Sequence, residues 1–367
     1  MFSTDPMVYG AGVDLRASAA RIEADLHPLV TALADWIRPP FTPARRRAIL
    51  AALAAAQGQV TRLGQLVNRY TVETRDPFHA RGDFLRLSRS LGVWQECADH
   101  LHRVIRQRPL PLLPARPPAD SMETAALDRL FEHLHLALSP KAPVLLVDGQ
   151  HGNIPLPMTR FLDLIRAAGR LLRAMDRPAP WSFVDVGCGL GLKLLAAQEL
   201  FQTLTGIELD AATARSARRL LSTARRNRAR AEASPTPWLT GALPPARTTI
   251  HHGNALDFGG YGAFDVIYAY RPIADAAARH RLEQRMVAEA RPGALLILPY
   301  PGDLAQGCLR LDEGLYWKPV RGMDAATLLR RAGHIGPLHP APAAAPQGDE
   351  AFAAPLARVL RHWGHMP

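Results

Sequence analysis

The stretch WSFVDVGCGLGLKLLAAQELF, residues 181–201, decides how this chain folds. A β-branched run at 183–186 leads into the turn GCGLG at 187–191, and a helical pattern follows at once. Glycines at such a turn permit positive φ angles and let a ligand approach the backbone, while the helix N-terminus presents free N–H groups. The segment therefore predicts a strand, a ligand-binding loop at its carboxyl end and a helix, as in a parallel α/β sheet.

Short apolar runs alternate with helical patterns from about residue 144 onward. The runs expected to form strands are residues 144–147, 183–186, 204–209, 248–251, 264–269 and 294–298. Strands separated by helical patterns predict βαβ units and a mainly parallel sheet with helices on both faces. Two further runs, 308–311 and 315–320, flank the turn residues 312–314 and predict a hairpin.

The region before this sheet has a helical pattern throughout. Apolar side chains recur at helical spacing in 15–37, 49–70, 87–101 and 127–138. Pro28 is expected to break or kink the first of these helices, and the Pro-rich residues 108–118 predict a linker or a surface strap. We therefore expect a helical N-terminal region at 1–140, an α/β domain at 141–335, and a Pro/Ala linker with a C-terminal helix at 336–367.

The composition limits the classes of function. Of 367 residues, 48% are hydrophobic and 21% are charged, which allows a packed core and excludes wholesale disorder. Lys+Arg outnumber Asp+Glu by 44 to 33, and the formal net charge of +11 favours an anionic partner such as nucleic acid, a membrane surface or an acidic substrate.

Cysteine spacing and apolar run length indicate the compartment. The three cysteines lie far apart without a CxxC pair, so we expect neither a disulfide framework nor a metal site. The N-terminus has no signal-peptide pattern, and no apolar stretch approaches the length of a membrane span. We expect a soluble, cytoplasmic protein.

The glycine spacing distinguishes between nucleotide ligands. A dinucleotide fingerprint has G-x-G-x-x-G, whereas this turn reads G-x-G-x-G and has Leu192 at the fingerprint's third glycine position. The next strand ends at Glu208, whose carboxylate can accept hydrogen bonds from both ribose hydroxyls of a bound adenosine. Asn254 and Asp257 follow the third strand, in a position to meet an adenine edge. The acidic residues therefore predict a bound adenosine, and the glycine spacing disfavours a nicotinamide dinucleotide.

Together these segments resemble the class I S-adenosylmethionine-dependent methyltransferase family. The matching segments, in family order, are VDVGCGLG at 184–191, GIELD at 206–210, GNALDF at 253–258, FDVIYAYRPI at 264–273 and EARPGALLILPYP at 289–301. Upstream, GNIPLPMTRFLDLIRAAG at 152–169 resembles the stretch that closes over the methionine end of the cofactor. The resemblance covers about half of the chain. It implies a Rossmann-like doubly wound, mainly parallel sheet of the methyltransferase type after an all-α region, with S-adenosyl-L-methionine as cofactor.

The resemblance also implies a role for each matching residue. Gly187 and Gly189 pass beneath the methionine portion of the cofactor, and Asp185 helps to hold its amino group. Glu208 binds the ribose hydroxyls, and Asp257 receives the adenine amino group. The other implied cofactor positions are Cys188, Gly191, Leu209, Asn254, Ala255 and Tyr268, with Ile207 beside the adenine slot.

The acceptor is indicated by the residues after the fourth strand, AYRPI at 269–273. Family members that methylate nucleic-acid amino groups usually carry Asp or Asn, then Pro-Pro and an aromatic residue, and this chain departs from that pattern. Tyr270 can orient an acceptor, and Arg271 can bind its carboxylate or phosphate through a planar guanidinium. His151, in a polar loop, is the candidate base. The alternative is that Tyr270, Arg271 and His151 belong to solvated loops.

We therefore expect a methyltransferase acting on an N or O nucleophile of a small molecule or of a peptide or protein. The alternatives are an RNA or DNA methyltransferase, a non-catalytic cofactor-binding scaffold of the same fold, and a nicotinamide oxidoreductase, which the glycine spacing disfavours. The basic helix at 211–230, with seven arginines, could contact phosphates or form a solvated face. The N-terminal helices are expected to cover the acceptor pocket or to form a homodimer.

Overall fold

The computed structural model describes residues 7–37, 41–73, 81–106, 109–114, 122–138, 156–232, 246–301, 307–336, 352–363 and 365. The chain divides into two compact units. A helical unit comprises Met1–Pro109, His334–Gly336 and Pro346–Pro367, and a sheet unit comprises Leu110–Gly333 and Pro337–Ala345. Among the described residues, no helix has the length and apolar character that crossing a membrane requires.

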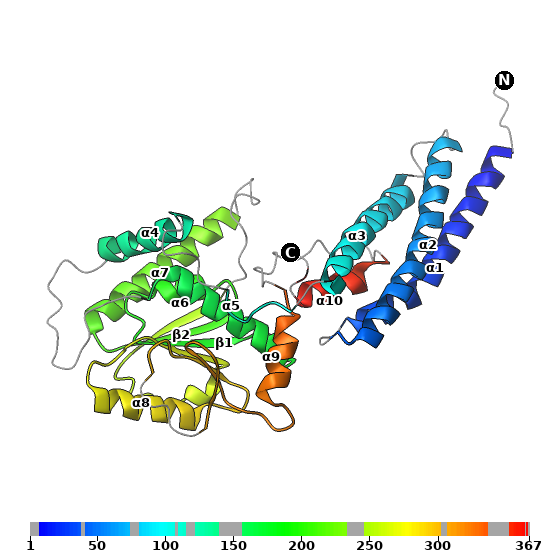
Figure 1. Cartoon of the computed structure of the whole chain (residues 1–367). Coiled ribbons are helices and arrows are strands. Elements are labelled where there is room, and N and C mark those ends of the chain that lie inside the picture. Colours follow the sequence, from blue (N-terminus) through cyan, green and yellow to red (C-terminus); the bar gives the residue numbers. More distant parts are fainter. Residues whose placement is uncertain are drawn as a thin grey trace. The chain divides into compact units, whose positions relative to one another are not determined.

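The helical unit is built from α1 (Met7–Trp36), α2 (Pro43–Glu73), α3 (Arg81–Arg106) and α10 (Ala354–His362). The first three helices lie side by side, and α10 contacts α1 and α3 (Figure 1). Leu26, Ile49 and Trp94 are fully buried in its core, and the Trp94 indole donates a hydrogen bond to Gln57 Oε1 (2.8 Å). The predicted all-α region is confirmed. The sequence predicts a break or a kink at Pro28, and α1 continues through this residue without a break.

The sheet unit contains seven strands. They are β1 (Ser182–Val186), β2 (Thr203–Glu208), β3 (Arg247–His252), β4 (Val266–Ala269), β5 (Leu295–Ile297), β6 (Leu309–Asp312) and β7 (Leu315–Trp317). Their order is β3-β2-β1-β4-β5-β7-β6, and β1 to β5 are parallel, whereas β7 is antiparallel to both of its neighbours. The expected mainly parallel sheet and the hairpin of β6 and β7 are confirmed.

Helices cover both faces of this sheet. The helices of the unit are α4 (Met122–Leu138), α5 (Met158–Ala174), α6 (Leu192–Ala197), α7 (Ala211–Glu232), α8 (Ala276–Glu289) and α9 (Ala325–Gly333). The first face carries α5, α6 and α7, and the opposite face carries α8 (Figure 1). Because side chains of a strand alternate between faces, Val184 and Val186 join the α8 core while Phe183 packs against Phe161 of α5. The doubly wound arrangement is therefore confirmed.

Two helices group differently from the predicted segments. The helix α4, which lies within the predicted N-terminal region 1–140, contacts α5 of the sheet unit, and the C-terminal helix α10 belongs to the helical unit. The domain division at 1–140, 141–335 and 336–367 stays a prediction. The strand expected at 144–147 lies outside the described residues.

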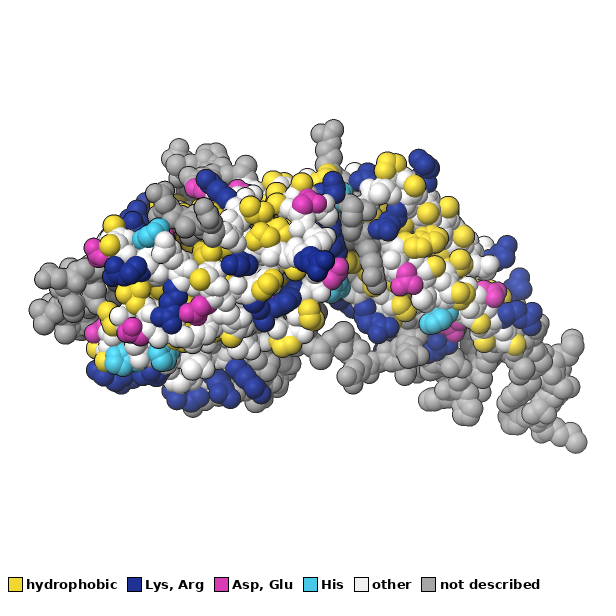
Figure 2. All heavy atoms as spheres, turned by 90° about the horizontal axis from the view of Figure 1, so that it is seen from below, with side chains coloured by type: hydrophobic (Ala, Val, Ile, Leu, Met, Phe, Trp, Pro, Cys, Tyr) yellow, Lys and Arg dark blue, Asp and Glu magenta, His cyan; other side chains and the backbone are white. Residues whose placement is uncertain are grey.

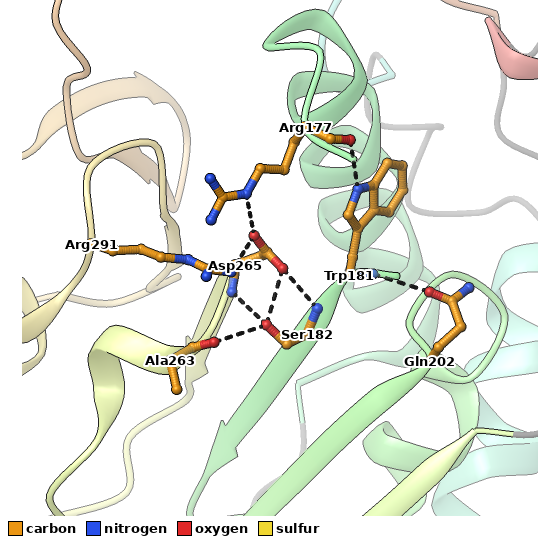
Figure 3. Close-up of polar contacts among 7 residues, drawn as sticks. All are labelled: Arg177, Trp181, Ser182, Gln202, Ala263, Asp265 and Arg291. Carbon is orange, nitrogen blue, oxygen red and sulfur yellow. Dashed lines mark hydrogen bonds and ion pairs between the residues drawn. The ribbon is translucent and has the colours of Figure 1, made fainter. Parts of the chain in front are cut away.

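A buried carboxylate joins the amino ends of β1 and β4 (Figure 3). Asp265, 4% exposed, accepts hydrogen bonds from the Ser182 amide (2.9 Å) and hydroxyl (3.0 Å). It also pairs with the guanidinium groups of Arg177 (2.7 Å) and Arg291 (2.5 Å). Two cations and two further donors satisfy the charge of Asp265, which fixes this end of the sheet opposite the glycine turn.

The described part of the Pro-rich segment is a strap on the sheet unit. Arg170 of α5, 7% exposed, donates hydrogen bonds to the carbonyls of Leu110 (3.3 Å), Pro111 (2.8 Å) and Leu112 (3.1 Å). The same guanidinium reaches the Ala332 carbonyl at the end of α9 (2.9 Å). Of the two interpretations of residues 108–118, these contacts support the strap for Leu110, Pro111 and Leu112.

Candidate functional site

A cavity of 670 Å³ opens at the carboxyl end of the parallel strands. Its wall comes from the turn after β1, the tip of β2, the loop after β3 and the end of β4, with α4 and the start of α5 on the remaining side. In the strand order, β2 and β3 follow β1 on one side, and β4 and β5 lie on its other side. Connections at such a switch point diverge, and the crevice between them is where open α/β sheets bind ligands.

The glycine turn exposes bare backbone to this cavity. Gly187 and Gly189 have φ angles of +79° and +53°, which an L side chain rarely adopts. A Cβ on Gly187 would lie 3.0 Å from the Pro272 Cβ, so a side chain there would require the segment after β4 to shift by a few tenths of an ångström. The amides of Gly187 (2.9 Å) and Cys188 (3.0 Å) both donate to the Ile207 carbonyl and fix the turn against β2.

Gly191 performs a different task from the other two glycines. It is the N-cap of α6 at φ +78°, and a Cβ there would contact Ala217 and Leu221 of α7 at 3.5 Å. Gly191 is therefore not part of the cavity wall. The sequence correctly predicted a glycine in this turn. Whether that glycine borders the cavity depends on where α7 packs.

Glu208 is held rigidly at the tip of β2. Its Oε2 accepts the Gly189 amide and its Oε1 accepts the Asp210 amide, each at 2.9 Å. Burial raises the pKa of Glu208 above its ordinary value, and these backbone donors oppose that shift. Each oxygen keeps further acceptor capacity, so the carboxylate can accept two neighbouring hydroxyl groups from a ligand in the cavity.

Asp185 is a buried carboxylate on the same wall. It is 2% exposed, lines the cavity, and accepts no hydrogen bond from any residue that the structure describes. Burial raises its pKa to about 7, although nearby Lys193 lowers it, and Glu208 adds to the increase. Such a group favours a cationic hydrogen-bond donor from a ligand.

Lys193 of α6 completes this wall, and the sequence analysis missed it. Its ammonium donates to the Leu156 carbonyl and to Met158 Sδ (3.8 Å) at the start of α5. Burial lowers its pKa to about 8, and the charges of Asp185 and Asp128 oppose this shift. A signal was present in the sequence, because the chain has only three lysines beside 41 arginines and one of them follows the glycine turn directly.

The loop after β3 contributes only part of what the sequence predicted. Asn254 and Ala255 line the cavity, as does Leu209 after β2. Asn254 Oδ1 accepts the Leu256 amide (3.0 Å), which shapes this loop. Asp257 is exposed and is not part of the wall, because the loop turns it outward, so its contact with adenine stays a prediction.

Aromatic and cationic side chains gather at the end of β4. Tyr268 is buried, and Tyr270 and Arg271 line the cavity. The Arg271 guanidinium lies over the ring of Tyr300 (4.5 Å), which also contacts the ring of Tyr270 edge-on (5.7 Å). Arg271 has a φ angle of +45°, which is uncommon for a residue other than glycine. The candidate base His151 lies outside the described residues.

Helix α4 forms a wall that the sequence analysis did not assign. Phe131, Glu132 and His135 line the cavity from this helix. Asp128 accepts the Thr159 amide (2.9 Å) and hydroxyl (2.7 Å), and so caps α5 from another helix. Burial lowers the pKa of His135, and Lys193 adds to the shift, which favours a neutral imidazole.

No family model and no curated protein sequence matches this chain. Solved structures similar to it include CalS10, an amino pentose methyltransferase from Micromonospora echinaspora (22% identity, 41% of this chain and 59% of that one, TM-score 0.27). Another is an RNA methyltransferase from Salinibacter ruber in complex with S-adenosyl-L-homocysteine (16% identity, 47% of this chain and 97% of that one, TM-score 0.30). A third is the N-methyltransferase NodS from Bradyrhizobium japonicum (17% identity, 46% of this chain and 71% of that one, TM-score 0.28). This chain thus spans about three fifths of CalS10.

The fold is that of a Rossmann-like, class I methyltransferase. Because the TM-scores lie below 0.5, this assignment rests on the chain's own strand order, the antiparallel β7, and the glycine turn at the switch point. The fold alone does not define the acceptor, since one fold carries many chemistries.

Proposed function

We propose that this protein is an S-adenosyl-L-methionine-dependent methyltransferase. The observation that carries the proposal is the position of Glu208, whose two oxygens are oriented by backbone amides at the tip of β2 and face the same cavity as the glycine turn. A carboxylate in this position fits the two ribose hydroxyls of an adenosine, and the side-chain-free backbone of Gly187 and Gly189 leaves room for the rest of the cofactor.

The residues present fit the remaining parts of this cofactor. Asp185 would accept the methionine ammonium, for which a buried carboxylate without a hydrogen-bond donor is suited. Leu209, Asn254 and Ala255 would lie beside the adenine, and Cys188, within the glycine turn, would also border the cofactor. Bound in this way, S-adenosyl-L-methionine supplies an electrophilic methyl group on a sulfonium.

The chain's own contribution to the reaction is orientation. Methyl transfer is an in-line displacement, so holding the nucleophile in position accounts for much of the acceleration. Tyr270 and Arg271 border the cavity after β4 and would align the acceptor, with the stack on Tyr300 holding the guanidinium plane. His151 stays a predicted base, and neutral His135 is a second candidate on the cavity wall.

The acceptor we propose is an N or O nucleophile of a small molecule or of a peptide or protein. The similar solved structures are described as acting on an amino pentose and on RNA, so they do not select one class. The segment after β4 lacks the Asp or Asn followed by Pro-Pro that is usual for nucleic-acid amino groups. Cytoplasmic location and a homodimer through the N-terminal helices stay predictions.

A nucleic-acid acceptor is the second candidate because of the net charge of +11. The described arginines of α7 are not part of the cavity wall, and Arg218 donates to the Ile250 carbonyl (2.9 Å). On the face that carries α8, Lys and Arg side chains are spread among hydrophobic and acidic ones (Figure 2). A dispersed basic surface supports weak, salt-dependent binding of nucleic acid more than a specific site.

Calorimetric titration with S-adenosyl-L-methionine, S-adenosyl-L-homocysteine and NAD tests the cofactor. We expect wild type to bind both adenosyl ligands but not NAD. We expect Glu208→Ala to weaken binding of the adenosyl ligands by at least about 100-fold, through loss of two charge-assisted hydrogen bonds. Glu289→Ala is the matched control, because Glu289 also accepts two backbone amides (Gly260 and Tyr261, 3.2 Å) but lies outside the cavity wall. Unchanged affinity in Glu208→Ala would contradict the proposal.

A further inference from the structure

Two oppositely charged side chains, Asp185 and Lys193, line the cavity without forming an ion pair with each other. Asp185 is the penultimate residue of β1, and Lys193 is the second residue of α6, so the glycine turn between them brings both onto one wall. The charge of each also favours the charged form of the other. Both are described residues, and no ion pair of 4.0 Å or less joins their charged atoms.

Leaving this pair open costs free energy. A buried ammonium and a buried carboxylate are each penalised by lost hydration, and direct contact would offset part of that penalty. Lys193 instead donates to the Leu156 carbonyl and approaches Met158 Sδ (3.8 Å), and its ammonium lies 5.0 Å from the centre of the Phe161 ring. These contacts hold the ammonium on the cavity side of α6 and leave its charge without a carboxylate at bonding distance.

A ligand that carries both an ammonium and a carboxylate would pair with both side chains at once. A free α-amino acid group carries an ammonium and a carboxylate on one carbon, and these match Asp185 and Lys193 respectively. No described arginine other than Arg271 lines the cavity, and the Arg271 guanidinium is stacked on Tyr300 after β4. Lys193 is therefore the cation beside the predicted methionine end.

We propose that Lys193 binds the α-carboxylate of the cofactor's amino-acid end, so that this cavity selects ligands with an intact zwitterionic α-amino acid. The inference rests on the proposed function and adds to it a specificity residue outside the motifs that the sequence analysis used. The competing role is structural, in which Lys193 only fastens the start of α5 through Leu156.

Binding of two ligands separates these roles. S-Adenosyl-L-homocysteine has the amino-acid end, whereas 5′-methylthioadenosine has the adenosine and sulfur without it. We expect Lys193→Met to weaken S-adenosyl-L-homocysteine binding about 10- to 100-fold, the effect of losing a hydrogen bond to a charged group. Binding of 5′-methylthioadenosine should change by less than about threefold, because its contacts do not reach Lys193.

Lys318→Met is the matched control, since the Lys318 ammonium also donates to a backbone carbonyl, that of Val287 (2.8 Å), away from the cavity wall. Both ligands should bind this variant as they bind wild type. If Lys193→Met weakens both ligands equally, Lys193 has the structural role and the proposal is overturned. It is also overturned if neither affinity changes.

A ligand-side measurement keeps the proposal testable if Lys193→Met does not fold. Wild type should bind the decarboxylated analogue of S-adenosyl-L-homocysteine about 10- to 100-fold more weakly than the parent compound. Equal affinity for the two ligands overturns the role of Lys193 and leaves the proposed function intact. Binding of no adenosyl ligand by wild type contradicts the proposed function itself.

Discussion

At the scale of single residues, the cavity wall holds charged side chains that a hydrophobic core would exclude. Asp185 is buried and Lys193 is half-buried, and loss of hydration shifts their pKa values to about 7 and about 8, so that both titrate near neutral pH. Perturbed groups of this kind concentrate at binding and catalytic sites because their charges are used by a ligand. The consequence is a ligand affinity that depends on pH.

We expect S-adenosyl-L-homocysteine affinity to fall as pH rises above 8. The carboxylate of the ligand favours charged Lys193, whose pKa of about 8 makes it mostly neutral at pH 9. Each further pH unit should weaken binding by up to about tenfold. The groups facing Lys193 are Asp185 of β1 and Asp128 and His135 of α4, and Glu208 acts through Asp185.

Calorimetry at pH 7, 8, 9 and 9.5 measures this dependence. The ligand's own amino group also titrates in that range, so the ratio of wild-type to Lys193→Met affinity isolates the lysine. That ratio should decrease above pH 8. A constant ratio across the range would show that titration of Lys193 does not affect binding.

At the scale of elements, a carboxylate of α4 caps the helix α5 of the sheet unit. Asp128 accepts both the amide and the hydroxyl of Thr159, while Pro157 at the N-cap of α5 offers no side-chain cap. The side of α4 that faces the cavity carries Phe131 and His135, whereas leucines such as Leu130 (54% exposed) lie on its outer side. With little apolar burial, α4 depends on this cap for its position.

Asp128→Ala should loosen α4. We expect amide hydrogen exchange in α4 to accelerate about tenfold, the effect of losing about 1–2 kcal/mol of capping free energy. The matched control is Asp324→Ala, because Asp324, directly before α9, accepts the amide (2.7 Å) and hydroxyl (2.9 Å) of Thr327 in the same way. Exchange in α4 should be unaffected by that control. Equal exchange in wild type and Asp128→Ala would indicate that α4 is held by other contacts.

At the scale of the whole molecule, the chain consists of two units that each bury their own core. Leu26 and Trp94 are buried in the helical unit, and Phe183 and Trp317 in the sheet unit. The cavity is lined by residues of the sheet unit. A ligand that binds one unit stabilises that unit in proportion to its occupancy.

We expect calorimetric unfolding to show two transitions, of which S-adenosyl-L-homocysteine raises only that of the sheet unit. At a ligand concentration 100 times Kd the stabilisation is about 2.7 kcal/mol, or about 5–10 °C for a unit of this size. NAD at the same concentration is the control and should leave both transitions in place. A single transition that moves as a whole would contradict independent unfolding of the units.

Sequence alone determined the parts of this protein that depend on local chemistry. The alternation of β-branched runs with helical patterns predicted β1 to β5 to within two residues at each end, because strand and helix periods differ. The glycine spacing and the acidic tip of β2 predicted a cavity in which Gly187 and Glu208 meet, since carboxyl ends of parallel strands share one edge.

Tertiary structure decided what depends on packing between distant segments. His133 and His135 are close in sequence, but only the position of α4 on α5 turns His135 toward the cavity. Asp257 matched a motif yet points outward, because the loop conformation, not the spacing, sets its direction. Lys193 gained its place from the burial of α6 against the start of α5, a contact that no periodic pattern encodes.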